Sequence, residues 1–97
     1  MKLKFRTEVI VWPGEAPWHL THLPKLRSQE LRKKFRSKQR GWNSLPVEVT
    51  LGKTVWRTSI FFDKKSESYI LPLKAEVRKK EGVYQGDKIA YSIEILV

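Results

Sequence analysis

The side chains best suited to chemistry in this chain are cations, gathered in a run of lysines and arginines between residues 25 and 40. Glu30 is the only acidic residue in that run. Such a density suits a phosphate backbone, because each contact releases counterions and several contacts together give salt-sensitive, sequence-independent binding. The alternative is a solvated face that keeps a small protein soluble, and an acidic protein or a lipid headgroup could also meet it. The nucleic-acid-binding candidates are Arg32, Lys33, Arg36, Lys38 and Arg40.

A second set of candidates mixes aromatic and polar side chains. Lys74 and Arg78 are one helical turn apart, so they share a face and could hold an anion together. Exposed tryptophans could stack on bases or line an apolar pocket at the mouth of a barrel. In the simpler interpretation, Trp12 and Trp18 cover the core and Arg78 forms an ion pair with Asp87. The ligand-binding candidates are Trp42, Trp56, Arg57, Ser59, Lys74 and Arg78.

Enzymatic chemistry finds little support in the sequence. The carboxylates are scattered, and no nucleophile elbow, phosphate loop or metal-ligand cluster is present. His19 and His22 are three residues apart in a predicted strand, so they point to opposite faces and make poor joint ligands. We therefore expect a non-enzymatic protein with no catalytic residues, no metal and no cofactor.

Length and charge set the broad class. The 97 residues predict one domain over 1–97, and the absence of cysteine excludes a disulfide framework. A net charge of +10 favours an anionic partner. No apolar run approaches the ~20 residues of a membrane span, and residues 1–12 alternate instead of forming a leader. We expect a cytoplasmic, soluble protein that is a monomer, with a homodimer left open.

Periodicity predicts the elements that must position these residues. Helical spacing begins at Ser28, the expected N-cap, with Glu30 in the first turn, and Gly82 is expected to end a second helix. On the strand that holds Trp56, Val55 is expected to point inward and Trp56 to the opposite side. The predicted strands are 2–12, 18–23, 47–51, 54–62, 69–72 and 88–96, and the predicted helices are 28–38 and 74–81.

The order of these elements occurs twice, over residues 2–51 and 54–96. Leu23-Pro24 in the first copy is taken to correspond to Leu71-Pro72 in the second. Two such copies can close on each other and remove their sheet edges. The predicted fold is all-β with two short helices: a pseudo-twofold double-split β-barrel built from two strand-strand-helix-strand units.

Several motifs together resemble a known bacterial family. They are Gly41-Trp42, Pro46-Val47-Glu48-Val49, Trp56-Arg57-Thr58-Ser59, the run from Tyr69 to Lys79, and Gly86-Asp87. The family is domain of unknown function nineteen-oh-five (DUF1905), and the resemblance extends from Phe5 to Ile95. It implies a double-split β-barrel related in fold to the AbrB/MazE/MraZ-like swapped-hairpin proteins, and it implies no activity. AbrB-like proteins bind DNA as dimers whose two chains complete the barrel, whereas both halves here lie in one chain.

The sequence thus predicts a small basic binding protein whose expected partner is nucleic acid, bound non-specifically through helix 28–38. Two alternatives stay open. A barrel mouth lined by Trp, Arg and Lys could hold a small anionic or aromatic ligand. The chain could instead be an interaction module for a protein partner.

Overall fold

The computed structural model describes residues 2–14, 17–39 and 41–97. Most of these residues lie in strands, as the alternating sequence predicts. The elements are β1 (Lys2–Trp12), β2 (Trp18–His22), α1 (Lys25–Lys34), η1 (Arg36–Lys38), η2 (Gly41–Asn43), β3 (Ser44–Leu51), β4 (Thr54–Asp63), β5 (Ser68–Pro72), α2 (Ala75–Glu81) and β6 (Lys88–Ile95). Neither α1 nor α2, nor any other described helix, is long and apolar enough to cross a membrane.

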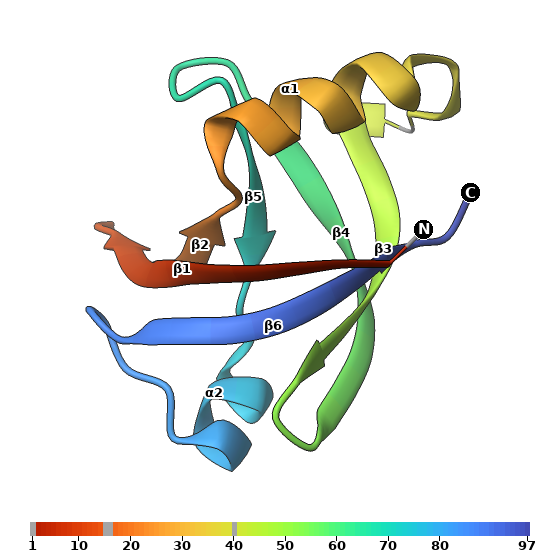
Figure 1. Cartoon of the computed structure of the whole chain (residues 1–97). Helices are drawn as coiled ribbons and strands as arrows, with labels where there is room; N and C mark the ends of the chain where they lie inside the picture. The colour runs from red at the N-terminus through yellow and green to blue at the C-terminus, as the bar shows by residue number, and fades with distance from the viewer. Residues whose placement is uncertain (1, 15–16, 40) are drawn as a thin grey trace.

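The strands form one closed barrel in the order β1-β2-β5-β4-β3-β6, and all the pairings are antiparallel. Helix α1 lies across one end of the barrel and α2 lies at the other (Figure 1). Closure pairs every strand with two neighbours over at least part of its length, which shortens the free strand edges. The predicted all-β barrel with two short helices is confirmed.

The pairing pattern is symmetric between the two halves of the chain. Exchanging β1, β2, α1 and β3 for β4, β5, α2 and β6 turns the β1–β2 pair into β4–β5 and the β1–β6 pair into β4–β3. The β2–β5 and β3–β6 pairs turn into themselves. The strands of the two halves interlock around the ring, as the pseudo-twofold arrangement requires.

Backbone hydrogen bonds fix which residues correspond between the halves. The N–H of Leu23 donates to the carbonyl of Tyr69, and the N–H of Leu73 donates to the carbonyl of His19, each at 2.9 Å. Leu23 therefore corresponds to Leu73, and Tyr69 corresponds to His19. The predicted match of Leu23-Pro24 with Leu71-Pro72 is wrong by two positions. The equivalent residues are those that directly precede each helix cap, and the repeated Leu-Pro dipeptide is not equivalent in the two halves.

The first helix differs from its prediction. Pro24 occupies the N-cap and α1 begins at Lys25, so Glu30 does not lie in the first turn. Ser28 is not the cap but a fully buried residue inside the helix. Its Oγ accepts a hydrogen bond from the backbone N–H of Tyr69 at 2.9 Å. The Ser28 hydroxyl thus provides a hydrogen-bond acceptor for a buried N–H group of β5. Helix-capping rules, which consider only neighbouring residues, cannot predict this long-range contact.

The inward register of β4 is the reverse of the prediction. Val55 is 56% exposed, whereas Trp56 is 9% exposed and belongs to the core. Burying an indole removes more apolar surface from water than burying an isopropyl group, so this register is favoured. The barrel interior also includes the fully buried side chains of Leu45, Val47, Val49, Ile60, Leu71 and Ile93.

A polar cluster lies inside the apolar barrel. The hydroxyl of Thr7 is hydrogen-bonded to Thr21 and, at 2.8 Å, to the phenol of Tyr91. The hydroxyl of Thr21 donates to the carbonyl of Glu8 at 2.8 Å. Burial raises the pKa of Tyr91 to about 12, against the opposing effect of its hydroxyl partners. The native state therefore holds this phenol in its neutral form.

This burial predicts a loss of stability in strong base. Above pH ~10 the unfolded chain releases the Tyr91 proton while the native state keeps it, so the native state binds more protons and stability falls as pH rises. We expect the free energy of unfolding to fall by about 1–2 kcal/mol between pH ~9 and pH ~11 from this residue. Urea titrations of the wild type and of Tyr91→Phe at both pH values isolate the contribution of the Tyr91 phenol. An equal fall in the free energy of unfolding in both proteins would show that Tyr91 is not its cause.

Candidate functional site

The basic segment of the sequence forms α1 and η1, and α1 lies across one end of the barrel (Figure 1). Lys33, Arg36 and Lys38 are exposed on α1 and η1. Arg32 is half-buried, and its guanidinium carbon lies 4.1 Å from the centroid of the Phe62 ring on β4. The fifth predicted cation, Arg40, lies outside the described residues. The structure thus brings three of the five predicted cations, Arg32, Lys33 and Arg36, to one groove, and Lys38 is not among its lining residues.

Few acids compensate the cations of this segment. The Nζ of Lys25 lies 3.1 Å from a carboxylate oxygen of Glu67, and Arg27 contacts Glu30 at 3.9 Å. Both pairs are about half exposed or more, so each contributes little to stability. Among the described residues, the four predicted cations form no ion pair at all. Their charge is available to an external anion.

Two tryptophans flank this region on the β1–β2 hairpin. Trp12 and Trp18 are directly opposite in the ladder, and their rings are parallel to within 2° with centroids 6.3 Å apart. They are 38% and 52% exposed. The interpretation of these residues as covers of the core is therefore wrong. Facing outward at a paired position, they stack on each other and leave flat apolar surface in contact with water.

Two grooves meet at Phe62, a core residue that lies under the Arg32 guanidinium. A groove of about 540 Å³ is lined by Trp12, Trp18, Phe61, Phe62, Asp63 and Ile70. A second groove of about 470 Å³ is lined by Gln29, Arg32, Lys33, Arg36, Phe62 and Glu67. We call the aromatic and cationic members of both grooves the aromatic–basic strip: Trp12, Trp18, Phe61, Phe62, Arg32, Lys33 and Arg36. The sequence prediction missed Phe61 and Phe62, which lie in an apolar run typical of core residues.

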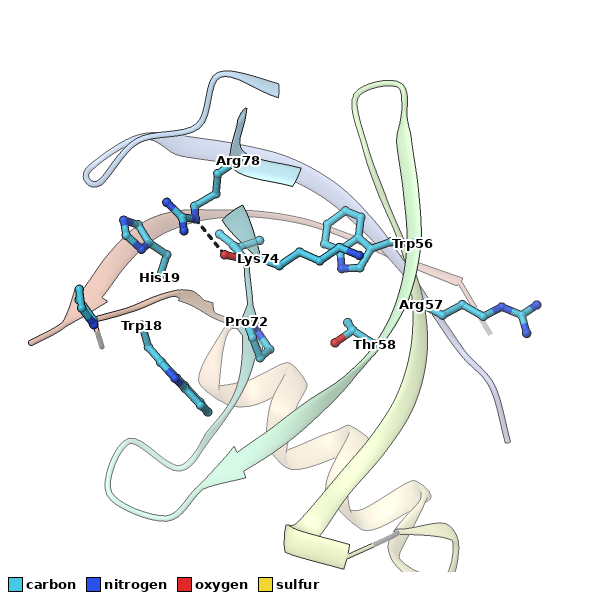
Figure 2. A pocket seen from close by; sticks show the side chains of 10 residues that line it. Trp18, His19, Trp56, Arg57, Thr58, Pro72, Lys74 and Arg78 are labelled. Atoms are coloured by element: carbon cyan, nitrogen blue, oxygen red, sulfur yellow. Dashed lines mark hydrogen bonds between the residues drawn. The ribbon is translucent and has the colours of Figure 1, made fainter. Parts of the chain in front are cut away.

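A separate cavity of about 260 Å³ opens where the sheet divides. Strand β4 pairs with β5 only over residues 61–63 and 68–70, so the part of β4 from Trp56 to Thr58 has β3 alone as its neighbour. The cavity lies between that part of β4, the start of β2, the end of β5 and α2 (Figure 2). Its lining residues are Pro17, Trp18, His19, Trp56, Arg57, Thr58, Pro72, Leu73, Lys74 and Arg78.

Four of the six predicted ligand residues line this cavity: Trp56, Arg57, Lys74 and Arg78. Ser59 is not among its lining residues. The side chain of Trp42 lies outside the described part of the chain. Arg57 contributes little, since its guanidinium points away from the cavity in Figure 2 and lies 3.3 Å from Glu48.

Arg78 does not pair with Asp87 as predicted. Its Nε donates to the carbonyl of Leu73 at 3.0 Å, drawn as a dashed line in Figure 2. Asp87 instead accepts the N–H of Tyr84 at 2.8 Å and closes its own turn, the role also expected of it. The backbone bond holds Arg78 against the end of β5, with its guanidinium turned toward the imidazole of His19 (Figure 2).

His19 is the residue of this cavity that the sequence did not predict. Its Nδ1 is buried and has no hydrogen-bond partner within the described part of the chain. Burial lowers the pKa of this imidazole, and the positive charge of Arg78 lowers it further. From the sequence, His19 was considered only as a metal ligand together with His22. No local pattern indicated that it would lie near Arg78 of α2.

The two histidines belong to different surroundings. The Nδ1 of His22 is hydrogen-bonded to the hydroxyl of Ser68 at 2.8 Å, near Trp12. Burial lowers the pKa of His22, and the nearby carboxylate of Asp63 opposes that shift. Within residues 2–14, 17–39 and 41–97, no group of three His, Cys, Asp or Glu side chains could hold a metal ion.

Comparison with known proteins connects this chain to one family. The sequence profile described as "Domain of unknown function (DUF1905)" matches residues 5–93. No curated protein matches the chain. The match covers every strand of the barrel at least in part, as well as both helices.

Proposed function

Because the chain belongs to the DUF1905 family, whose description assigns no function, we propose one from the geometry: the protein binds single-stranded nucleic acid along the aromatic–basic strip. The observation that carries the proposal is the shared position of Phe62. Phe62 is a core residue only 9% exposed, but it lines both the groove beside the stacked tryptophans and the groove beside the cations of α1, so the two grooves adjoin. A single strand needs both surfaces side by side, one for bases and one for phosphates.

The two halves of the strip supply different parts of the affinity. Lys33 and Arg36 are exposed cations that can contact phosphates, and such contacts are independent of base sequence. The flat faces of Trp12 and Trp18 can stack on bases, which contributes about 1–3 kcal/mol per base. Arg32 is already held over Phe62, so its guanidinium is ordered before a ligand arrives.

A single strand is favoured over a duplex by the exposed rings. Base faces are free to stack in a single strand, whereas in a duplex they are covered by neighbouring base pairs. A duplex would use only the cations of the strip. The proposed mode therefore predicts that binding requires unpaired bases but does not distinguish one base sequence from another.

The proposal includes a relation to the AbrB/MazE/MraZ-like proteins and a setting in the bacterial cytoplasm. The support for that relation is the order of two strand-strand-helix-strand units in one closed barrel. Because one chain supplies both units, we propose that a monomer is the binding species. A fold relation raises the expectation of DNA or RNA binding but does not identify the surface. The surface is argued from the strip alone.

Titration of the wild-type protein into labelled oligothymidylate and into a duplex of equal length tests the proposal. We expect tighter binding of the single strand, quenched tryptophan fluorescence, and Kd values on the order of 10⁻⁴–10⁻⁶ M. Three phosphate contacts would give a slope of about −2 for log K against log salt concentration, measured between about 50 and about 200 mM salt. Absence of binding at low salt would overturn the proposal and favour a protein partner. Preference for the duplex would overturn the stacking mode.

A further inference from the structure

We propose that the cavity between β4, β5 and α2 is a second binding site, for a compact oxyanion that carries a small flat apolar group. The oxyanion is a phosphate or a carboxylate. The cavity lies at the α2 end of the barrel, away from α1 (Figures 1 and 2). This proposal does not rest on nucleic-acid binding, since Trp18 is the only residue that lines the cavity and belongs to the strip.

The first argument is that the two equivalent ends of the barrel are built differently. The N–H of Ser28 donates to the carbonyl of Pro24 at 2.9 Å, and the N–H of Arg78 donates to that of Lys74 at 3.1 Å. Ser28 therefore corresponds to Arg78 and Pro24 to Lys74. Tyr69 corresponds to His19 by the same register.

At the α1 end these positions are packed and satisfied. Ser28 is fully buried and accepts the N–H of Tyr69. The Tyr69 ring is fully buried too, and its hydroxyl accepts a hydrogen bond from Gln39 at 2.6 Å. At the α2 end a guanidinium and an imidazole take the same two places. Packing alone disfavours such a replacement, because Arg78 is half-buried and the buried Nδ1 of His19 has no partner in the described chain.

The second argument is the set of donors that the cavity presents. Only the Nε of Arg78 is hydrogen-bonded within the described chain, so the outer N–H groups of its guanidinium are available. The ammonium group of Lys74 forms no hydrogen bond or ion pair with a described residue. His19 adds the buried, unpartnered Nδ1, and a neutral imidazole can donate from either ring nitrogen.

The charge of the lining is one-sided. Two of the three side chains just described are cations, and none of the described residues that line the cavity is a carboxylate. A guanidinium fork matches the paired oxygens of a phosphate or a carboxylate, and such charge-assisted hydrogen bonds are about twice as strong as neutral ones. A cation or a neutral sugar would leave these charges without a counterion. The class of ligand that fits is an oxyanion.

Size and wall chemistry define the rest of the ligand. The volume of about 260 Å³ is below the ~300–1,000 Å³ of sites for drug-sized ligands, so the ligand is small. Trp56, Pro72 and Leu73 add apolar atoms to the lining. Figure 2 shows Lys74 extending across the mouth toward Trp56, so the charged and apolar parts face one another. A ring bearing one anionic substituent satisfies both.

The test uses four probes: inorganic phosphate, phenyl phosphate, benzoate and the neutral analogue phenol. Proton–nitrogen NMR of the full chain follows the His19 imidazole and the Trp56 indole during each titration. We expect phenyl phosphate or benzoate to shift both resonances saturably and phenol to shift neither. Whichever of phenyl phosphate and benzoate binds more tightly shows whether the site prefers a phosphate or a carboxylate. Shifts with inorganic phosphate alone would overturn the apolar part of the proposal.

Two arginines on the same cavity rim provide a matched comparison. Arg78→Gln should weaken binding of the better probe at least tenfold, whereas Arg57→Gln should leave it within twofold, although both remove one positive charge. Equal weakening in both variants would show non-specific charge attraction and overturn the site. Because Arg78 also bonds to the Leu73 carbonyl, Lys74→Met serves as a second variant without that structural bond and should weaken binding in the same direction. Binding of oligothymidylate should be unchanged in all three variants. The probe titrations therefore test the oxyanion cavity, and the oligothymidylate titrations test nucleic-acid binding independently.

Discussion

Lys33→Glu combined with Arg36→Glu is expected to weaken binding of single-stranded oligonucleotide, and of random duplex, by well over tenfold. Each substitution removes a phosphate contact and places a negative charge where the backbone must lie. Each lost contact also flattens the salt dependence of log K by about 0.7 for a single strand, so the slope should fall by about 1.4. Fluorescence anisotropy at several salt concentrations measures the affinity and the slope together.

The control for this experiment changes the net charge equally at the other end of the barrel. Lys53→Glu with Lys79→Glu alters two exposed lysines, one in the β3–β4 turn and one on α2. We expect less than threefold weakening, since only the overall field of the protein is reduced. If this pair weakens binding as much as the α1 pair, total charge and not the α1 face determines the affinity. Circular dichroism confirms that both variants are folded.

Trp12→Ala is expected to weaken binding of oligothymidylate by about 5-fold to 150-fold, the equivalent of one stacked base at about 1–3 kcal/mol. Trp12 is the better choice of the stacked pair, because Trp18 also lines the oxyanion cavity. The salt slope should stay unchanged, since no phosphate contact is lost. This combination separates stacking from charge, because the α1 variant changes both affinity and slope.

Trp12→Phe is the matched variant, because it retains a flat ring at the same position. It should recover most of the affinity that Trp12→Ala loses. Thermal unfolding should differ little among the three proteins, since Trp12 is outside the core and 38% exposed. Unaltered affinity in Trp12→Ala would show that the tryptophan pair does not touch the ligand.

Strand alternation predicted the barrel well, because a half-buried strand must repeat every two residues. The runs that became β1 and β6 show this most clearly. Gly82 was also predictable as the end of α2, and it adopts φ 62°, where a side chain would be strained. These features depend on neighbours in the sequence.

The errors arose where distant residues decide the outcome. Ser28 looks like a helix cap, but the buried N–H of Tyr69 recruits its hydroxyl from another strand. Val55 and Trp56 alternate correctly, but only the assembled barrel determines which of them faces inward. Local propensity carries no information about either contact.

The candidate sites were predictable to different degrees. The cations of α1 are adjacent in sequence, so composition alone found them. Phe62 and His19 were missed because each acquires its role from another element: Phe62 from Arg32 on α1, and His19 from Arg78 on α2. Lys74 and Arg78 were found through helical spacing, yet that spacing alone could not predict that they line one cavity with Trp56 of β4.

The interlocked order of strands has a consequence for any half-length form of this chain. In the ring β1-β2-β5-β4-β3-β6, neither half supplies a run of strands that closes on itself. A fragment ending near Gly52 would expose the edges of β2 and β3 that normally meet β5, β4 and β6. Such a fragment could bury these edges by pairing with a second copy of itself, so we expect the isolated half to dimerise or to remain unfolded.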